Sequence, residues 1–337
     1  MVPAPVLAAF GWEDAQTQSA TSGLINETYF VVLDGRRHAV LQQLHPVFGP
    51  TVNLDLEAVT EHLAKHGLVT PRLIRTAAGE AWAEHDAKYW RAITYVPGRT
   101  FEQVPSIEAA QSAGELIGRF HRAMADFDRE FAHVRTGVHD TAAHVAKLAT
   151  LRGSHSLPEI DALAAEILHE ADRLFDFSNL PVRPCHGDLK ISNVLFSSDS
   201  HEAICLIDLD TNAMQLVAHE MGDALRSWCN PHPEDSDCPE VSLDILSAAI
   251  HGYARGSAGL LSLAEQASIA PGFQTIPIEL AARFCADAYE DKYFGWDASR
   301  YPSRRAHNLA RAKSQLRLGQ AVHAARSQID ASICAAF

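Results

Sequence analysis

One segment near the middle of the chain constrains the fold more than any other. It reads HGDLKISN over residues 186–193, and Asp208 follows fifteen residues after Asn193, within the apolar run AICLIDL. The runs NVLF and AICLIDL flank the turn-like sequence SSDSHE, which is typical of a β-hairpin. Such a hairpin would return Asp208 to the loop that contains Asp188 and Asn193.

Each position of this pattern can perform a defined part of phosphoryl transfer. Asp188 can accept a hydroxyl proton, the amide oxygen of Asn193 can bind a metal, and Asp208 can hold the same Mg²⁺ from the other side. Magnesium prefers oxygen ligands, so the site needs no His or Cys. Alternatively, a single aspartate can simply cap a turn or end a strand. The combination of the three residues with the hairpin favours phosphoryl transfer.

The remaining sequence predicts an α+β fold with two lobes. Residues 17–44 read as three short antiparallel strands, residues 52–67 as a helix, and residues 71–96 as two further strands. Beyond them the apolar spacing is helical, except at the central hairpin. We therefore expect a small antiparallel-sheet lobe with one helix over residues 1–96 and a larger, mainly helical lobe over residues 97–337. The clearest helical periods cover residues 158–176, 241–263, 276–294 and 305–332.

Composition narrows the choice of partners. The chain has 28 Lys and Arg against 42 Asp and Glu, a net charge of −14, and no basic run. This balance disfavours nucleic acid and anionic membrane surfaces as partners. No positive charge precedes Arg36, no apolar run is long enough for a signal sequence or a membrane span, and the six cysteines form no CxxC pair. We expect a cytoplasmic monomer or weak dimer with reduced cysteines that acts on small molecules.

The central motif resembles the aminoglycoside phosphotransferase and choline kinase superfamily, which has a bilobal protein-kinase-like fold and a catalytic loop that begins H-G-D. The likeness extends over residues 22–318. A bacterial branch, the N-acetylhexosamine 1-kinases, is similar to this chain in the segments GLINETYFV, AVLQQL, YWRAITYVPG, IDLDT, GDALR, ELAARF and HNLARAKSQLRL. That branch phosphorylates the anomeric hydroxyl of N-acetylglucosamine or N-acetylgalactosamine.

The resemblance therefore implies an ATP- and Mg²⁺-dependent kinase that makes a sugar 1-phosphate. Two alternatives stay open. The chain could be a kinase of the same fold for another small hydroxylated substrate, such as an aminoglycoside, homoserine or a choline-like alcohol. It could also be a nucleotide-binding protein without turnover.

The resemblance also assigns nucleotide-binding residues in the small lobe. The loop 22–27, which includes Asn26, would lie over the triphosphate. Glu57 matches the glutamate of the small-lobe helix, although it could equally be an exposed helix residue. Backbone groups before Pro97-Gly98 would meet adenine, and they belong to Thr94, Tyr95 and Val96.

One position departs from the superfamily pattern. Gln42 stands in the third strand where a Lys or Arg usually contacts the α- and β-phosphates. A neutral amide donates a hydrogen bond but supplies no charge. We expect Lys190, two residues after the catalytic Asp188, to supply the missing charge beside the transferring phosphoryl group.

Substrate recognition is expected from ELAARFCADAYEDKYFGW in the helical lobe, where Arg283 and Tyr293 match the branch by position. The Arg283 fork can donate two hydrogen bonds to sugar hydroxyls or an acetamide oxygen, and Tyr293 offers an aromatic face to a pyranose. The alternative for Arg283 is a helix salt bridge with Glu279 or Asp287. In GDALR, Asp223 and Arg226 are interpreted as an internal structural pair.

Overall fold

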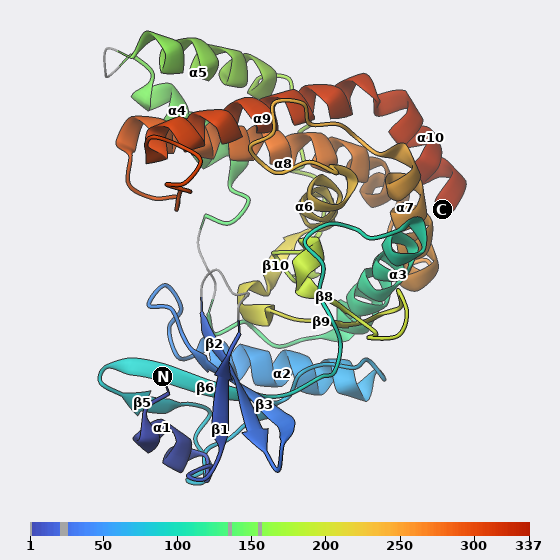
Figure 1. Ribbon diagram of the computed structural model, residues 1–337. Coiled ribbons are helices and arrows are strands. Elements are labelled where there is room, and N and C mark those ends of the chain that lie inside the picture. The colour runs from blue at the N-terminus through green and yellow to red at the C-terminus, as the bar shows by residue number, and fades with distance from the viewer. Residues whose placement is uncertain (1, 21–25, 134–136, 154–156) are drawn as a thin grey trace.

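The computed structural model describes residues 2–20, 26–133, 137–153 and 157–337, and shows a sheet-based lobe beneath a larger helical lobe (Figure 1). The predicted mixed fold, with its antiparallel sheet at the N-terminal side and helices beyond, is confirmed. No helix in these described stretches has both the length and the apolar composition needed to cross a bilayer.

The small lobe contains a six-stranded antiparallel sheet in the order β1-β2-β3-β6-β4, with β5 also paired to β6. The hairpin between β2 and β3 turns at Asp34 and Gly35, which both have positive φ. The chain between residues 71 and 96 forms three strands, where two were predicted. The strands are β1 (Gln16–Ser19), β2 (Glu27–Leu33), β3 (Arg36–Gln43), β4 (Leu73–Ile74), β5 (Ala83–His85) and β6 (Lys88–Thr94).

Helices cover both faces of this sheet. The predicted helix is α2 (Val52–Lys65), on the side of the large lobe (Figure 1). A short helix that was not predicted, α1 (Ala4–Ala9), covers the other face, where Val6 and Trp12 pack in one cluster with Leu41. Because side chains alternate along a strand, the residue after Leu41 points to the opposite face, toward the large lobe.

The large lobe is a set of helices around two short antiparallel strand pairs. The predicted hairpin is present as β8 (Val194–Phe196) and β9 (Ala203–Leu206), and β7 (Val182–Cys185) pairs with β10 (Ala213–Leu216). Short 3₁₀ turns are η1 (Met124–Asp126), η2 (Ile191–Asn193) and η3 (Leu209–Thr211). The helices are α3 (Ile107–Ala123), α4 (Thr141–Leu151), α5 (Pro158–Ala171), α6 (Val217–Cys229), α7 (Leu243–Ser257), α8 (Leu263–Glu290), α9 (Arg304–Ala324) and α10 (Arg326–Ala336).

Helices α3 and α7 pack with their backbones in direct contact. A Cβ atom added at Gly114 would lie 2.1 Å from the Ala249 carbonyl oxygen, and one added at Gly252 would lie 2.0 Å from that of Gln111. No side chain larger than hydrogen fits at either position without a shift of backbone. Next to this contact, the ring of His121 on α3 is 2.8 Å from the Tyr253 hydroxyl on α7.

Candidate active site

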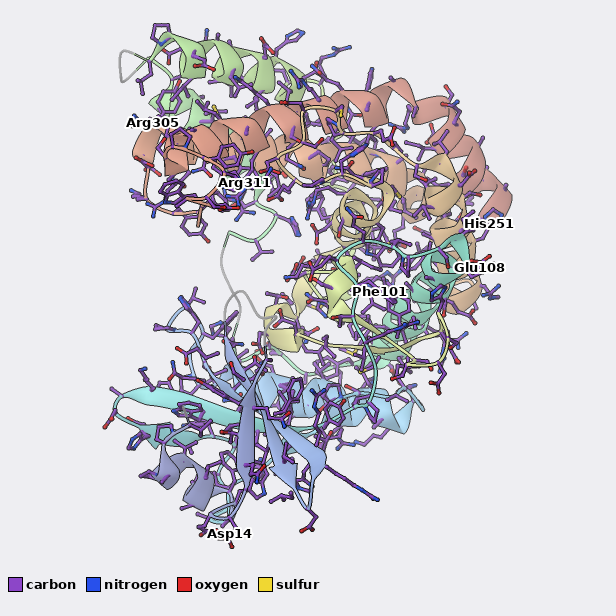
Figure 2. The ribbon with its side chains drawn as sticks, in the orientation of Figure 1. Asp14, Phe101, Glu108, His251, Arg305 and Arg311 are labelled. Carbon is purple, nitrogen blue, oxygen red and sulfur yellow. The ribbon has the colours of Figure 1, made fainter. Side chains whose placement is uncertain are left out.

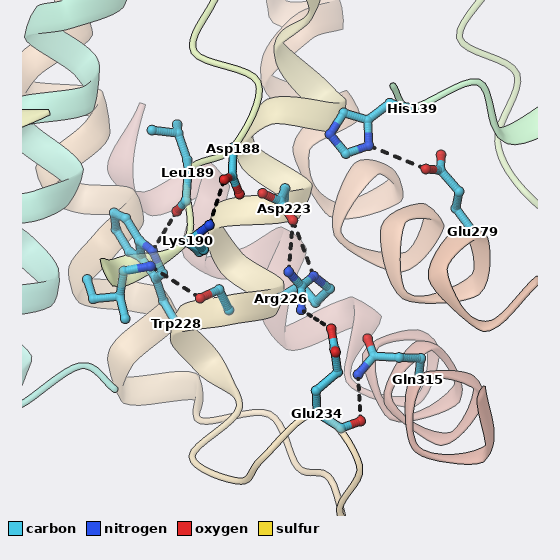
Figure 3. Close-up of polar contacts among 12 residues, drawn as sticks. His139, Asp188, Leu189, Lys190, Asp223, Arg226, Trp228, Glu234, Glu279 and Gln315 are labelled. Atoms are coloured by element: carbon cyan, nitrogen blue, oxygen red, sulfur yellow. Dashed lines mark hydrogen bonds and ion pairs between the residues drawn. The ribbon is translucent and has the colours of Figure 1, made fainter. Parts of the chain in front are cut away.

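The loop that contains Asp188 is organised around that carboxylate. The ammonium of Lys190 donates to Asp188 Oδ2 at 2.7 Å, and the Asn193 amide donates to the same oxygen at 3.0 Å and to the Asp188 carbonyl at 2.8 Å. Figure 3 shows the Lys190 contact. The structure therefore brings together three of the residues that the sequence selected, in one hydrogen-bonded group.

The hairpin β8–β9 brings Asp208 to the same place, directly before η3. Its backbone is left-handed, with φ 65° and ψ 50°. Burial, together with the negative charges of Asp210 and Asp188, raises the pKa of Asp208 to about 6. The negative charges of Asp188 and Asp210 disfavour the ionised form of Asp208. A bound dication would relieve the repulsion among the three carboxylates. The oxygen donors of Asp208 and Asn193 thus fit a hard cation such as Mg²⁺.

A buried glutamate that sequence reasoning missed fixes the backbone of the loop that contains Asp188. Glu220 on α6 accepts the amide hydrogens of His186 at 2.7 Å and Gly187 at 2.8 Å. Burial acts to raise the pKa of Glu220, but hydrogen bonding and positive charge from His121 outweigh it and lower the pKa. The sequence signal that could have revealed Glu220 is the position of this acidic residue on the apolar face of a helical pattern.

Gly187 is required by its surroundings. Its φ is 82°, and an added Cβ would lie 2.4 Å from the Thr211 carbonyl oxygen. The Thr211 hydroxyl in turn donates to the His186 carbonyl at 2.8 Å. The loop before Asp188 and the turn after Asp208 are therefore in backbone contact, which sets the relative position of the two acids.

A buried cation lies beside Gln42 on the neighbouring strand. Arg91 on β6 pairs directly with Gln42 on β3, so both side chains lie on the face toward the large lobe. Arg91 is 1% exposed, donates to Gln42 Oε1 at 2.9 Å, and forms a two-contact ion pair with Asp210, whose longer arm is 2.8 Å. Asn26 donates to the same carboxylate at 2.9 Å. This buried network joins the small lobe to η3.

Breaking this ion pair should destabilise the protein strongly. Arg91→Met leaves Asp210 as a buried charge without its partner, so we expect the free energy of unfolding to fall by about 3–5 kcal/mol. Adding Asp210→Asn should recover part of that loss. The measurement is urea unfolding followed by circular dichroism.

Arg255→Met serves as the control for this experiment, because Arg255 forms an exposed ion pair with Glu115. It should cost about 1 kcal/mol or less. If Arg91→Met prevents folding, Arg91→Lys keeps the charge and should fold with a smaller loss. Equal stability of Arg91→Met and Arg255→Met would contradict the assignment.

The other described residues predicted to contact the nucleotide lie outside the network of Gln42, Arg91 and Asp210. Glu57 on α2 forms a bidentate pair with Arg75, at 2.8 and 2.6 Å, and does not contact Gln42. The Thr94 amide donates to the Arg72 carbonyl at 2.8 Å and the Tyr95 amide to the His38 carbonyl at 3.5 Å, which leaves the Val96 amide as the better candidate for adenine. Most of the loop 22–27 lies outside the described residues.

A cavity of about 650 Å³ opens at Asp188 and Asp208. Its walls contain Arg283 and Tyr293, the two residues that the sequence selected for substrate binding, together with His139. Asp188, Asp208, Arg283 and Tyr293 thus line a single space, although they come from three separate segments of the chain. Its volume is that of an ordinary small-molecule site.

The wall that carries Tyr293 is held by Asp287 and by arginines of α9. Asp287, near the end of α8, accepts the amide hydrogens of three consecutive residues of this wall, 292–294, at 3.1, 2.8 and 2.8 Å. Arg305 and Arg311, labelled in Figure 2, donate to the carbonyls of Ala288 and Gly295, each at 2.8 Å. The position of Tyr293 is therefore fixed from both sides.

Several charges in the cavity wall already have partners, and Figure 3 shows His139 with Glu279 and Asp223 with Arg226. Burial acts to lower the pKa of His139, but the hydrogen bond and charge of Glu279 outweigh it and raise the pKa. The interpretation of Asp223 and Arg226 as an internal pair agrees with their 3.0 Å contact. Other wall pairs are Lys147 with Glu290 at 2.7 Å and Arg283 with Glu279 at 3.8 Å.

Comparison with known proteins adds a family and a fold. A model of the phosphotransferase enzyme family matches residues 16–257. Homoserine kinases of Methylobacillus flagellatus and Bradyrhizobium diazoefficiens are each 28% identical to the chain, over 213 and 218 residues. Each match covers 63% of this chain, and the chain spans 63% and 61% of the length of these relatives.

Two solved structures have the same fold. An aminoglycoside phosphotransferase from Alicyclobacillus acidocaldarius gives a TM-score of 0.69 at 17% identity, covering 98% of this chain and 97% of that one. A choline kinase from Cryptosporidium parvum gives 0.58 at 11% identity, covering 97% and 95%.

Proposed function

This chain belongs to the phosphotransferase enzyme family, and from that premise we propose that it transfers a phosphoryl group from ATP to the anomeric hydroxyl of an N-acetylhexosamine. The observation that carries the reaction class is that Asp188 and Asp208 line one cavity, with the Asn193 amide 3.0 Å from Asp188 Oδ2. The relatives are named homoserine kinases, which makes homoserine the second candidate acceptor.

Each functional residue in and after the catalytic loop has a separate role in this proposal. Lys190 and Asn193 both donate to Oδ2 of Asp188, and no group in the described part of the chain donates to Oδ1. Oδ1 is therefore the atom that accepts the proton of the attacking hydroxyl. Asn193 and Asp208 would hold Mg²⁺, which neutralises charge on the phosphates when bound. Lys190 adds a positive charge beside the hydroxyl and the transferring group.

The charge pattern of the cavity supports a neutral acceptor. Homoserine carries a carboxylate and an ammonium, and each would need an opposite charge in the wall. The cations Lys147 and Arg226 each have an acidic partner within the protein, and Arg283 shares Glu279 with His139. Hydroxyl and acetamide groups need hydrogen bonds only, and Arg283 can supply them from its side chain, which is 23% exposed.

The aromatic residues of the same wall also suit a sugar ring. Tyr293 and Phe294 form an edge-to-face pair with centroids 4.8 Å apart, and the guanidinium of Arg283 lies 5.7 Å from the Phe294 centroid. Such a corner offers an apolar face to the C–H surface of a pyranose and donors to its hydroxyls.

Product analysis tests this proposal. The protein is incubated with ATP, Mg²⁺ and one acceptor at a time: N-acetylglucosamine, N-acetylgalactosamine, their 1-deoxy analogues or L-homoserine. We expect a phosphorus NMR signal of an anomeric phosphate from the two sugars only, because the 1-deoxy analogues lack the attacked hydroxyl. Phosphorylation of homoserine alone would establish the second candidate. If no acceptor in the panel is phosphorylated, neither an N-acetylhexosamine nor homoserine is the substrate.

A further inference from the structure

Two histidines and an aspartate converge at the junction of the lobes, away from the catalytic cavity. His62 lies in the last turn of α2, His66 is the residue that directly follows this helix, and Asp126 belongs to η1, which follows α3. The Nε2 atoms of both rings lie close to a single oxygen, Asp126 Oδ1, at 3.1 Å for His62 and 3.3 Å for His66. We propose that His62, His66 and Asp126 form a binding site for a divalent cation of the zinc type.

The separations match a tetrahedral centre. Zinc binds imidazole nitrogen and carboxylate oxygen at about 2.0–2.1 Å, so neighbouring ligand atoms of a tetrahedron lie about 3.3–3.4 Å apart. The two measured contacts, 3.1 and 3.3 Å, are within a few tenths of an ångström of that edge. One ring nitrogen of each histidine and one carboxylate oxygen of Asp126 all lie within 4.8 Å of one another. A single ion can therefore touch all three with small side-chain movements.

Neighbouring residues provide a further oxygen atom that could bind the ion and a ring that restrains one of the histidines. The Ala123 carbonyl oxygen lies 2.8 Å from His62 Nε2 and can approach the same ion. The ring of Phe127 packs edge-on against His62, with centroids 5.3 Å apart, and restrains its orientation. The Asp126 side chain is 69% exposed, so an ion can enter from solvent.

The donor set distinguishes this site from the magnesium site of the catalytic loop. Two imidazoles and one carboxylate favour zinc and the neighbouring transition metals, whereas magnesium prefers oxygen ligands alone. Hydrogen bonding is the competing explanation, and it requires a proton on each Nε2. Metal binding requires both Nε2 atoms without protons. The two explanations therefore differ in whether the chain binds a zinc ion at these residues, which can be measured.

A bound ion would have a mechanical consequence. His62 and His66 lie at the C-terminal end of the small-lobe helix, inside it and directly after it, whereas Asp126 follows the first helix of the large lobe, so the ion would cross-link the lobes. Helix α2 also contacts η3, the turn after Asp208. The cross-link would restrict movement between α2 and the large lobe next to that turn.

Zinc retention tests the site. The full chain is loaded with Zn²⁺ alone, dialysed against excess Mg²⁺ to clear the oxygen ligands of the catalytic site, and assayed for metal content. We expect His66→Gln and Asp126→Asn to retain one equivalent less than the unmodified chain. Their zinc affinity should fall by more than the about 10–100-fold that loss of an outer-shell partner costs. His169→Gln is the matched control, because His169 is an exposed histidine at the end of helix α5.

The proposal predicts a second signature. Zinc should raise the thermal midpoint of the unmodified chain and of His169→Gln, and leave that of His66→Gln unchanged. Equal zinc content in the unmodified chain and in His66→Gln would overturn the site. Neither readout depends on phosphoryl transfer, so the test remains decisive if the proposed acceptor is wrong.

Discussion

Asp188→Asn should lower the turnover of the proposed reaction by about 10²–10⁴-fold, because the amide cannot accept the hydroxyl proton. The change is nearly isosteric, and Lys190 and Asn193 can still donate to the remaining oxygen, as they do to Asp188 Oδ2. Circular dichroism and ATP affinity should therefore stay close to those of the unmodified chain. Single-turnover rates measure the effect. A variant that retains more than about a tenth of the rate would show that Asp188 is not the base.

Asp208→Ala should abolish activity at every accessible magnesium concentration. A bound dication stabilises the charge of the transferring group by several kcal/mol, so losing it should lower turnover by about 10²-fold or more. Asp210 cannot replace Asp208, because its carboxylate is already held by Arg91 and Asn26. The measurement is the rate as a function of Mg²⁺ concentration.

Two variants accompany Asp208→Ala. Asn193→Ala removes only an amide oxygen, so excess Mg²⁺ or Mn²⁺ should partly restore its rate. Asp199→Ala, in the exposed turn of the β8–β9 hairpin, removes an acid outside the site and should be silent. Full activity of Asp208→Ala with magnesium would refute the metal assignment.

The features that could be read from the sequence are those with local signals. The hairpin after Asn193 and the Asp34-Gly35 turn each depend on residues within about one strand of each other, and both are present. Helix α8 was expected to begin near residue 276, yet it begins at Leu263 and continues through Pro271 and Pro277. Proline is a local signal against helix, and here the packing of the surrounding helices overrides it.

The features that were missed depend on long-range pairing. Arg91 lies beside Gln42 because β3 and β6 pair across 49 positions of sequence. No local pattern gives that register, so sequence reasoning did not place a cation beside Gln42. Glu220 was missed for the same reason, since it reaches the catalytic loop from α6, 33 positions along the chain from Gly187.

The backbone contact between α3 and α7 limits how this protein can be engineered. Exchanging a helical glycine for alanine is a standard route to heat-resistant variants, because it gains up to about 1 kcal/mol where space allows. At Gly114 and Gly252 the new methyl group would collide with a carbonyl oxygen of the facing helix. The resulting separation would act on His121, which supports the glutamate beneath the catalytic loop. Thermostabilisation of this chain should therefore leave Gly114 and Gly252 unchanged, although helix propensity alone favours alanine at both positions.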